Sequence, residues 1–384
     1  MKKIHAICIL TVILAWVALT PADVFWANTG TDFNSASSFT NLAGAAQAPT
    51  SSDFVYFASC AVTQPILTSN LTIKGFGFSL SNNYATATND GFNGYNFSGY
   101  NFTAQNGAKL TLGNSGSAFA ILSQTYGTNV VDVPIQFSAL TNVTRTIRAN
   151  FGRLDFNKPF STLGLTNTLG FSMNNDPVIY LNADNSGFRS KASFDGSGYI
   201  YMTTTNALLQ MTAFSFSSWG ATGSKCIHLV NNTGSPLNFS MLSATCAALD
   251  GLDFVGQPFL FSNALWTCEF RESKPFYFNA RTVIGNFASA SNSSYALNTG
   301  LRISGTNSLE LLGDFCSATV RTNYLMFENG LYIPRTAAGL PATSFNRIGT
   351  LQNGTPRLAL FADFPGSLTV DAVPGGFVSD QYST

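Results

Sequence analysis

Acidic side chains are the residues of this chain best suited to acid–base chemistry. Glu269 and Glu272 flank Arg271, and Asp250 stands three residues before Asp253. Two carboxylates can supply an acid and a base to a glycosidic bond when they converge. After residue 22, no two carboxylates stand at i and i+2, the spacing that would place both on one strand face. These five residues are the candidates for a polysaccharide-active enzyme, and the simpler interpretation is a solvated loop or a surface ion pair.

Histidine is nearly absent. His228 is the only one after residue 22, which argues against a histidine-based triad or a multi-histidine metal centre. We expect it to be a satisfied, partly buried side chain. Phosphate-loop, zinc-protease and nucleophile-elbow motifs are missing from the sequence. The sequence therefore favours a protein without enzymatic activity and without a cofactor, and it leaves enzymatic activity as the alternative.

Oxygen-rich turns offer a weak case for calcium. Asparagine and aspartate cluster at 174–176 and 182–185, and such oxygens can bind Ca²⁺ in secreted proteins. Neither an EF-hand spacing nor a repeated Gly-Gly-x-Gly-x-Asp pattern accompanies them. Ordinary Asn and Asp turns explain both clusters more simply.

Five cysteines follow residue 22, with no Cys-x-x-Cys pair among them. An odd number permits at most two disulfides, and buried thiols acting as small apolar residues are the simpler interpretation. Cys226 and Cys246 lie 20 residues apart, about one turn of a stacked-coil fold. They are the first candidate pair for a disulfide.

Composition indicates a folded chain covered by uncharged polar residues. Of its 384 residues, 45% are hydrophobic and only 10% are charged, with 19 basic and 19 acidic side chains. Nucleic-acid binding depends on clustered Lys and Arg, so this balance argues against such a partner. The 34 Phe and 13 Tyr among many Asn, Gly, Ser and Thr are typical of short strands joined by tight turns.

The first 22 residues differ in composition from the rest of the chain. A basic start, a mostly apolar run from 4 to 19 and a Thr-Pro-Ala end predict a cleaved secretory signal peptide. The apolar run is shorter than the ~20 residues that span a bilayer, and no later run reaches that length. We therefore expect a secreted or cell-surface protein with no transmembrane segment after signal removal.

Short alternating segments recur along the chain at roughly 20 to 25 residues, the range of stacked-coil folds. This degenerate repetition favours an all-β parallel β-helix, a β-solenoid, forming a single elongated domain; a pair of β-sandwiches is the alternative. Residues 23–58 are expected to form an N-terminal entry and capping unit, 59–371 the repeats and 372–384 a tail. Residues 244–253 are the one short stretch where helical spacing fits better than alternation.

Several motifs resemble the opening unit and strand repeats of bacterial autotransporter-type passenger proteins. An aromatic pair, an Asp/Asn-rich segment ending in an aromatic residue, and a Pro-x-x-x-Asp turn before a strand ending in Phe stand at 25–26, 31–39 and 49–57. Strand repeats resembling theirs stand at 70–78, 107–113, 196–202 and 305–313. The resemblance implies a right-handed parallel β-helix with an adhesive role. The chain departs from the family because it ends in Gln-Tyr-Ser-Thr and not in a membrane barrel.

These observations predict a structural or adhesin-like surface protein that contacts glycans or other surface proteins without catalysis. A polysaccharide lyase or glycoside hydrolase built on a β-helix is the alternative. Trp219 and Trp266 could stack on sugar rings, although burial in the core is the simpler expectation for each.

Overall fold

The structure is a computed structural model. It describes residues 23–79, 97–113, 119–138, 142–162, 164–208, 210–218, 226–248, 252–268, 276–289, 300–303, 305–317, 324–327, 330–339, 347–350 and 357–359. The predicted signal peptide and tail, most of the Asn/Gly/Tyr-rich stretch at 82–99, and parts of the predicted repeats lie outside these residues.

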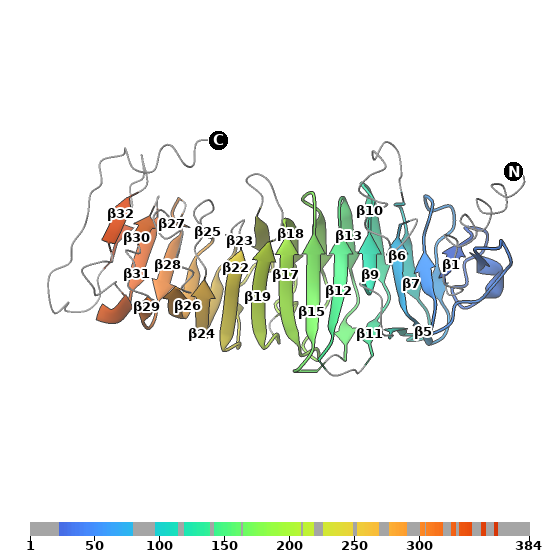
Figure 1. The fold of residues 1–384 in the computed structure, drawn as a ribbon, viewed down its shortest axis with the longest axis horizontal. Coiled ribbons are helices and arrows are strands. Elements are labelled where there is room, and N and C mark those ends of the chain that lie inside the picture. The colour runs from blue at the N-terminus through green and yellow to red at the C-terminus, as the bar shows by residue number, and fades with distance from the viewer. Residues whose placement is uncertain are drawn as a thin grey trace, which may run out of the picture.

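The described chain forms a parallel β-solenoid (Figure 1). Strands belong to three sheets of 17, 12 and 4 strands, in which strands from successive turns pair in parallel, apart from the antiparallel pair β1–β2. The 12-stranded sheet runs without interruption from β4 to β32 in chain order. The colours of Figure 1 accordingly pass from blue at one end of the rod to red at the other. The predicted all-β, single elongated solenoid is confirmed, and the β-sandwich alternative is wrong.

The 12-stranded sheet positions the candidate site. Its strands are β4 (Ile66–Leu67), β7 (Asn101–Ala104), β10 (Thr128–Asp132), β13 (Arg153–Phe156), β16 (Val178–Leu181), β18 (Gly198–Met202), β20 (Ile227–Asn231), β23 (Leu252–Gly256), β25 (Phe276–Asn279), β27 (Gly300–Ile303), β30 (Tyr324–Phe327) and β32 (Arg347–Thr350).

The 17-stranded sheet covers another side of the same core. It contains β1 (Asp23–Trp26), β2 (Phe39–Asn41), β3 (Phe54–Tyr56), β6 (Gly75–Phe78), β9 (Ile121–Ser123), β12 (Thr144–Ala149), β15 (Thr168–Met173), β17 (Lys191–Gly196), β19 (Ala213–Ser218), β21 (Leu237–Asn238), β22 (Ser243–Ala248), β24 (Phe259–Cys268), β26 (Thr282–Ser289), β28 (Ser308–Leu311), β29 (Phe315–Ser317), β31 (Leu331–Pro334) and β33 (Arg357–Leu358).

The 4-stranded sheet lies in the N-terminal half and contains β5 (Leu71–Ile73), β8 (Leu110–Leu112), β11 (Ile135–Phe137) and β14 (Phe160–Ser161). Two short 3₁₀ helices, η1 (Ala36–Ser38) and η2 (Ala337–Gly339), complete the described elements. In the described part of the chain, no helix is long and apolar enough to cross a membrane.

Alternation along each strand builds the core, because every second side chain of a strand points to the same face. Parallel, in-register pairing then stacks like residues from turn to turn. Phe171 on β15, Phe194 on β17 and Phe216 on β19 form one such ladder, with ring centroids 5.4 and 4.8 Å apart. The ring of Trp266 on β24 packs with its centroid 5.9 Å from that of Phe216, although the register pairs Trp266 with Ala244 of β22 and not with the ladder position.

One sequence expectation fails in this region and another is confirmed. Residues 244–253 were expected to favour a helical turn, but the segment enters β22 and β23, which belong to different sheets. Alanines make the alternation of apolar and polar residues hard to see in this segment. Pairing with the strands of neighbouring turns makes it extended. Trp266 is buried in the core, as the simpler expectation has it, with 1% of its surface exposed, so it does not stack on a sugar.

The N-terminal unit uses both faces of its strands. Trp26, Phe33 and Phe57 belong to the main core, whereas Phe54 and Tyr56 pack outside it with Leu122. Residues 54 to 57 therefore alternate between the two faces, as in any extended strand. Strand β1 pairs in parallel with β3 and antiparallel with β2. The stack of parallel strands therefore has an antiparallel strand at this end.

Candidate functional site

Three outward-facing positions on adjacent strands of the 12-stranded sheet place chemistry-bearing side chains side by side. Tyr199 on β18 stands in register with His228 on β20, which stands in register with Asp253 on β23. Their neighbours Ile227, Leu229 and Leu252 are fully buried in the core. Since side chains alternate along a strand, the core fixes the outward direction of this row.

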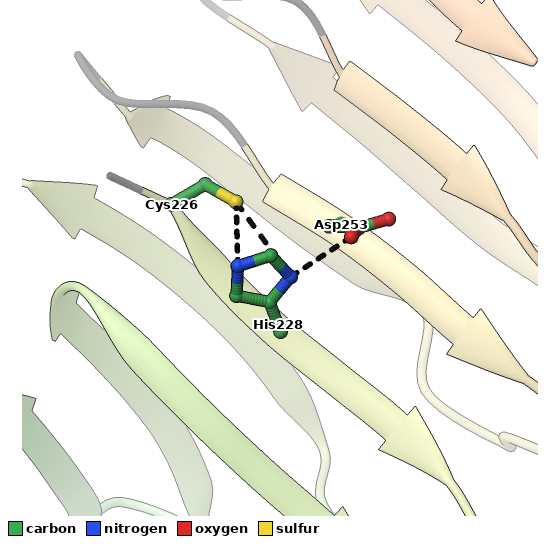
Figure 2. Close-up of side chains that lie close together, drawn as sticks. All are labelled: Cys226, His228 and Asp253. Atoms are coloured by element: carbon green, nitrogen blue, oxygen red, sulfur yellow. Dashed lines mark hydrogen bonds and ion pairs between the residues drawn. The ribbon is translucent and has the colours of Figure 1, made fainter. Parts of the chain in front are cut away.

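Cys226, just before β20, completes a cluster with His228 and Asp253 (Figure 2). The thiol Sγ of Cys226 lies 3.2 Å from Nε2 of His228, and Nδ1 of the same ring lies 2.8 Å from Oδ2 of Asp253. An ionised carboxylate can only accept a hydrogen bond, so Nδ1 carries the hydrogen and Nε2 faces the thiol. The same sulfur lies 3.8 Å from Nδ1, so it faces the ring edge that carries both nitrogens, with Nε2 the nearer one and the one that can take a proton from the thiol.

Two further side chains hold the Cys226–His228–Asp253 cluster in place. Asn279 on β25 donates from Nδ2 to Oδ1 of Asp253 at 2.7 Å, so both carboxylate oxygens accept a hydrogen bond. The Tyr199 ring stacks on the imidazole of His228 with centroids 4.1 Å apart and planes 5° apart. Burial raises the pKa of Tyr199, with the charges of Cys226 and Asp176 acting in the same direction. Tyr199 is therefore a neutral phenol around neutral pH.

Burial differs across the cluster. Cys226 is 6% and Asp253 5% exposed, whereas the His228 side chain keeps 21% of its surface in contact with solvent. Buried charges are costly unless they are paired and hydrogen-bonded. The carboxylate meets that condition through His228 and Asn279.

A row of tyrosines and one ion pair continue the same outer face toward the N-terminus. Tyr180 stacks on Tyr201 with centroids 4.6 Å apart, and the guanidinium of Arg153 lies 4.0 Å from the centroid of Tyr180. Arg153 also binds both oxygens of Asp155, at 2.7 and 2.8 Å. The rings stack along the rod, as expected for identical residues in parallel register. We call Arg153, Asp155, Tyr180, Tyr199 and Tyr201 the tyrosine row.

The sequence-based site residues meet different outcomes. Asp253 lies in the cluster, where its partners are His228 and Asn279. Asp250, Glu269, Arg271, Glu272 and Trp219 lie outside the described residues, so their roles stay predictions.

The predicted Cys226–Cys246 disulfide is not formed in the structure, where Cys226 carries a thiol. Cys226 adjoins β20 of the 12-stranded sheet, whereas Cys246 lies on β22 of the 17-stranded sheet. The Cys246 backbone stands in register with Cys268 on β24, the next turn along. The sequence distance of 20 residues therefore does not place the two cysteines on one sheet.

The 182–185 turn considered for calcium uses its oxygens within the protein. Asp184 accepts hydrogen bonds from the Asn206 amide and the Ser186 backbone, and these bonds lower the pKa of its carboxyl group. Asn185 accepts from the backbone of Phe160. These contacts are those of ordinary Asn and Asp turns, and calcium binding stays a prediction.

Two spacings in the sequence carry the signal of this cluster. Cys226 and His228 stand at i and i+2, the spacing of two residues on one strand face. Asp253 follows His228 by 25 residues, about one turn of the predicted repeat. The two spacings together could have indicated the site.

The comparisons with known proteins add no relatives: no family model, no curated protein and no solved structure matches the chain. The candidate site therefore depends on its own geometry.

Proposed function

We propose that this chain is a structural or adhesin-like β-solenoid of the cell surface or the secreted space, which contacts glycans or surface proteins through the tyrosine row. The observation that carries this proposal is the row itself. It gathers three phenol rings, one guanidinium and one carboxylate on neighbouring turns of one outer face.

The tyrosines of this row are better placed to form hydrogen bonds with a partner than to stack their rings on a sugar. Tyr180 has Arg153 over one face and Tyr201 over the other, so its faces are occupied within the protein. Phenol hydroxyls and the Arg153–Asp155 pair are groups that exchange hydrogen bonds with sugar hydroxyls or a polar protein surface. The low charge of the chain supports a partner that is itself nearly uncharged.

Location and ancestry belong to the same proposal. The pattern of residues 1–22 supports secretion, and the solenoid fold suits the proposed kinship with autotransporter-type passenger proteins. A long rod whose sides repeat from turn to turn offers an extended surface for contact.

The test is a glycan-binding screen of the purified chain, followed by variants. We expect binding without cleavage, and a loss of at least about tenfold in affinity for the double variant Tyr180→Ala with Tyr201→Ala, because aromatic residues dominate most interfaces. The matched control is Thr111→Ala with Gln136→Ala, two partly exposed positions on the 4-stranded sheet. Turnover of a glycan, or equal affinity of both double variants and the unaltered chain, would contradict the proposal.

A further inference from the structure

We propose that Cys226, His228 and Asp253 form a nucleophilic thiol site that reacts with soft carbon electrophiles. This goes beyond surface contact and is independent of it. A reactive cysteine needs a base within hydrogen-bond reach and a third group that orients the base. The Sγ–Nε2 distance of 3.2 Å and the Nδ1–Oδ2 distance of 2.8 Å provide both.

The surroundings favour the thiolate–imidazolium form. Proton transfer from Sγ to Nε2 places a positive charge on a ring whose Nδ1–H already donates to the Asp253 carboxylate. Asn279 holds the other carboxylate oxygen, and the parallel ring of Tyr199 offers its π face to the cation. Each contact is stronger when His228 is charged, and a nearby imidazolium stabilises a thiolate.

The same geometry argues against a metal centre as the main role of the cluster. The ligand atoms lie within 4.8 Å of one another, but one edge of the imidazole faces Cys226 and its Nδ1 faces Asp253 (Figure 2). A cation between Sγ and Nε2 would have two protein ligands, with Asp253 in the supporting position behind the histidine. Structural zinc sites use four.

Other titratable groups that face His228 come from each neighbouring strand. Asp253 lies on β23 and Tyr199 on β18, Tyr277 on β25 stands in register with Asp253, and the charge of Asp176 reaches Tyr199 from the turn before β16. Tyr199 keeps its proton well beyond neutral pH, since burial raises its pKa. Asp253 is the carboxylate that is hydrogen-bonded to the imidazole, whereas the Asp176 charge acts on Tyr199.

Iodoacetamide is a suitable probe of this chemistry. The Cys226 thiol transfers its proton to His228, the sulfur forms a bond to the methylene carbon, and the carbon–iodine bond breaks to release iodide. The proton stays on the imidazole or passes to water. Peptide mapping by mass spectrometry measures the rate at Cys226 in the folded chain, and Cys226→Ser confirms the assignment.

The shape of the pH profile is the decisive readout, because burial of Cys226 slows alkylation in every variant. We expect the unaltered chain to react at nearly the same rate from pH 6 to 8. In His228→Gln the rate should rise with pH toward the ordinary thiol range, near 8.5, and should be about tenfold lower at pH 6. Thr103→Ser, at a partly exposed position on β7 of the same sheet, is the matched control and should behave like the unaltered chain.

Asn279→Ala is the second variant and covers the case in which His228→Gln does not fold, as checked by circular dichroism. It weakens the support of Asp253 and should move the profile part of the way toward that of His228→Gln. A rate at Cys226 that rises steeply with pH in the unaltered chain would overturn the proposal. So would a folded His228→Gln variant with an unchanged profile.

Discussion

Buried asparagines close the turns of the solenoid at the scale of single residues. Asn185 accepts from the backbone N–H of Phe160 at 2.8 Å and donates to the carbonyl of Ala207 at 3.0 Å, while 4% exposed. Asn129 does the same for Tyr100 and Phe97. Irregular backbone between strands needs such partners, because unpaired buried polar groups are costly. The uncharged, Asn-rich composition is thus explained by the turns.

Asn185→Ala tests this role. It leaves the Phe160 N–H and the Ala207 carbonyl without their side-chain partner, and we expect a loss of about 2–3 kcal/mol in the free energy of unfolding. Urea titration followed by circular dichroism measures it. Asn182→Ala is the control. Asn182 has an exposed hydrogen bond with Asn157 and a partly buried one with Thr203, and the variant should lose less than about 1 kcal/mol. Equal losses in both variants would contradict a special role for buried turn amides.

At the scale of elements, the strands are held by ladders of like side chains. Phe194 illustrates this, because it contacts Phe171 from the preceding turn and Phe216 from the following one. Its neighbour Ser193 on β17 faces outward and is partly exposed. One strand therefore carries a core position and a surface position in consecutive residues.

Phe194→Ala should cost about 3–5 kcal/mol of unfolding free energy, because it opens a cavity between two turns that cannot collapse independently. Ser193→Ala, next to it on the same strand, should change stability by less than about 0.5 kcal/mol. Thermal and urea unfolding of the two variants would measure the difference. A small loss for Phe194→Ala would mean that the core repacks around the missing ring.

These elements also show what the sequence can and cannot predict. Alternation and repetition at 20 to 25 residues predicted the parallel solenoid, since both are local patterns. The helical spacing at 244–253 misled because the outcome depends on pairing with neighbouring turns. The cluster at His228 needed the register between β20 and β23, which depends on the lengths of irregular connections. Asp253 was recognised as a candidate, but its partners were not.

At the scale of the whole molecule, a solenoid must protect its first and last turns, because each turn contacts mainly its neighbours. The N-terminal unit provides this at one end. The ring centroid of Phe57 lies 5.0 Å from that of Phe78 and 4.7 Å from that of Tyr100. The centroid of Phe33 lies 4.4 Å from that of Phe102. Strand β3 also pairs along β6. Removing the unit would uncover both an apolar surface and a strand edge.

Deletion of residues 23–57 tests that protective role. An uncovered parallel edge with exposed phenylalanines is a template for pairing with another chain. We therefore expect the shortened protein to associate and to unfold at a lower temperature than the undeleted chain at the same concentration. Light scattering and circular dichroism measure the two effects. If the shortened chain kept the same mass in solution and the same unfolding temperature, the first described turn would be dispensable and β6 would end the stack by itself. The predicted capping role of residues 23–58 would then be wrong, although the parallel fold of the later turns would stand.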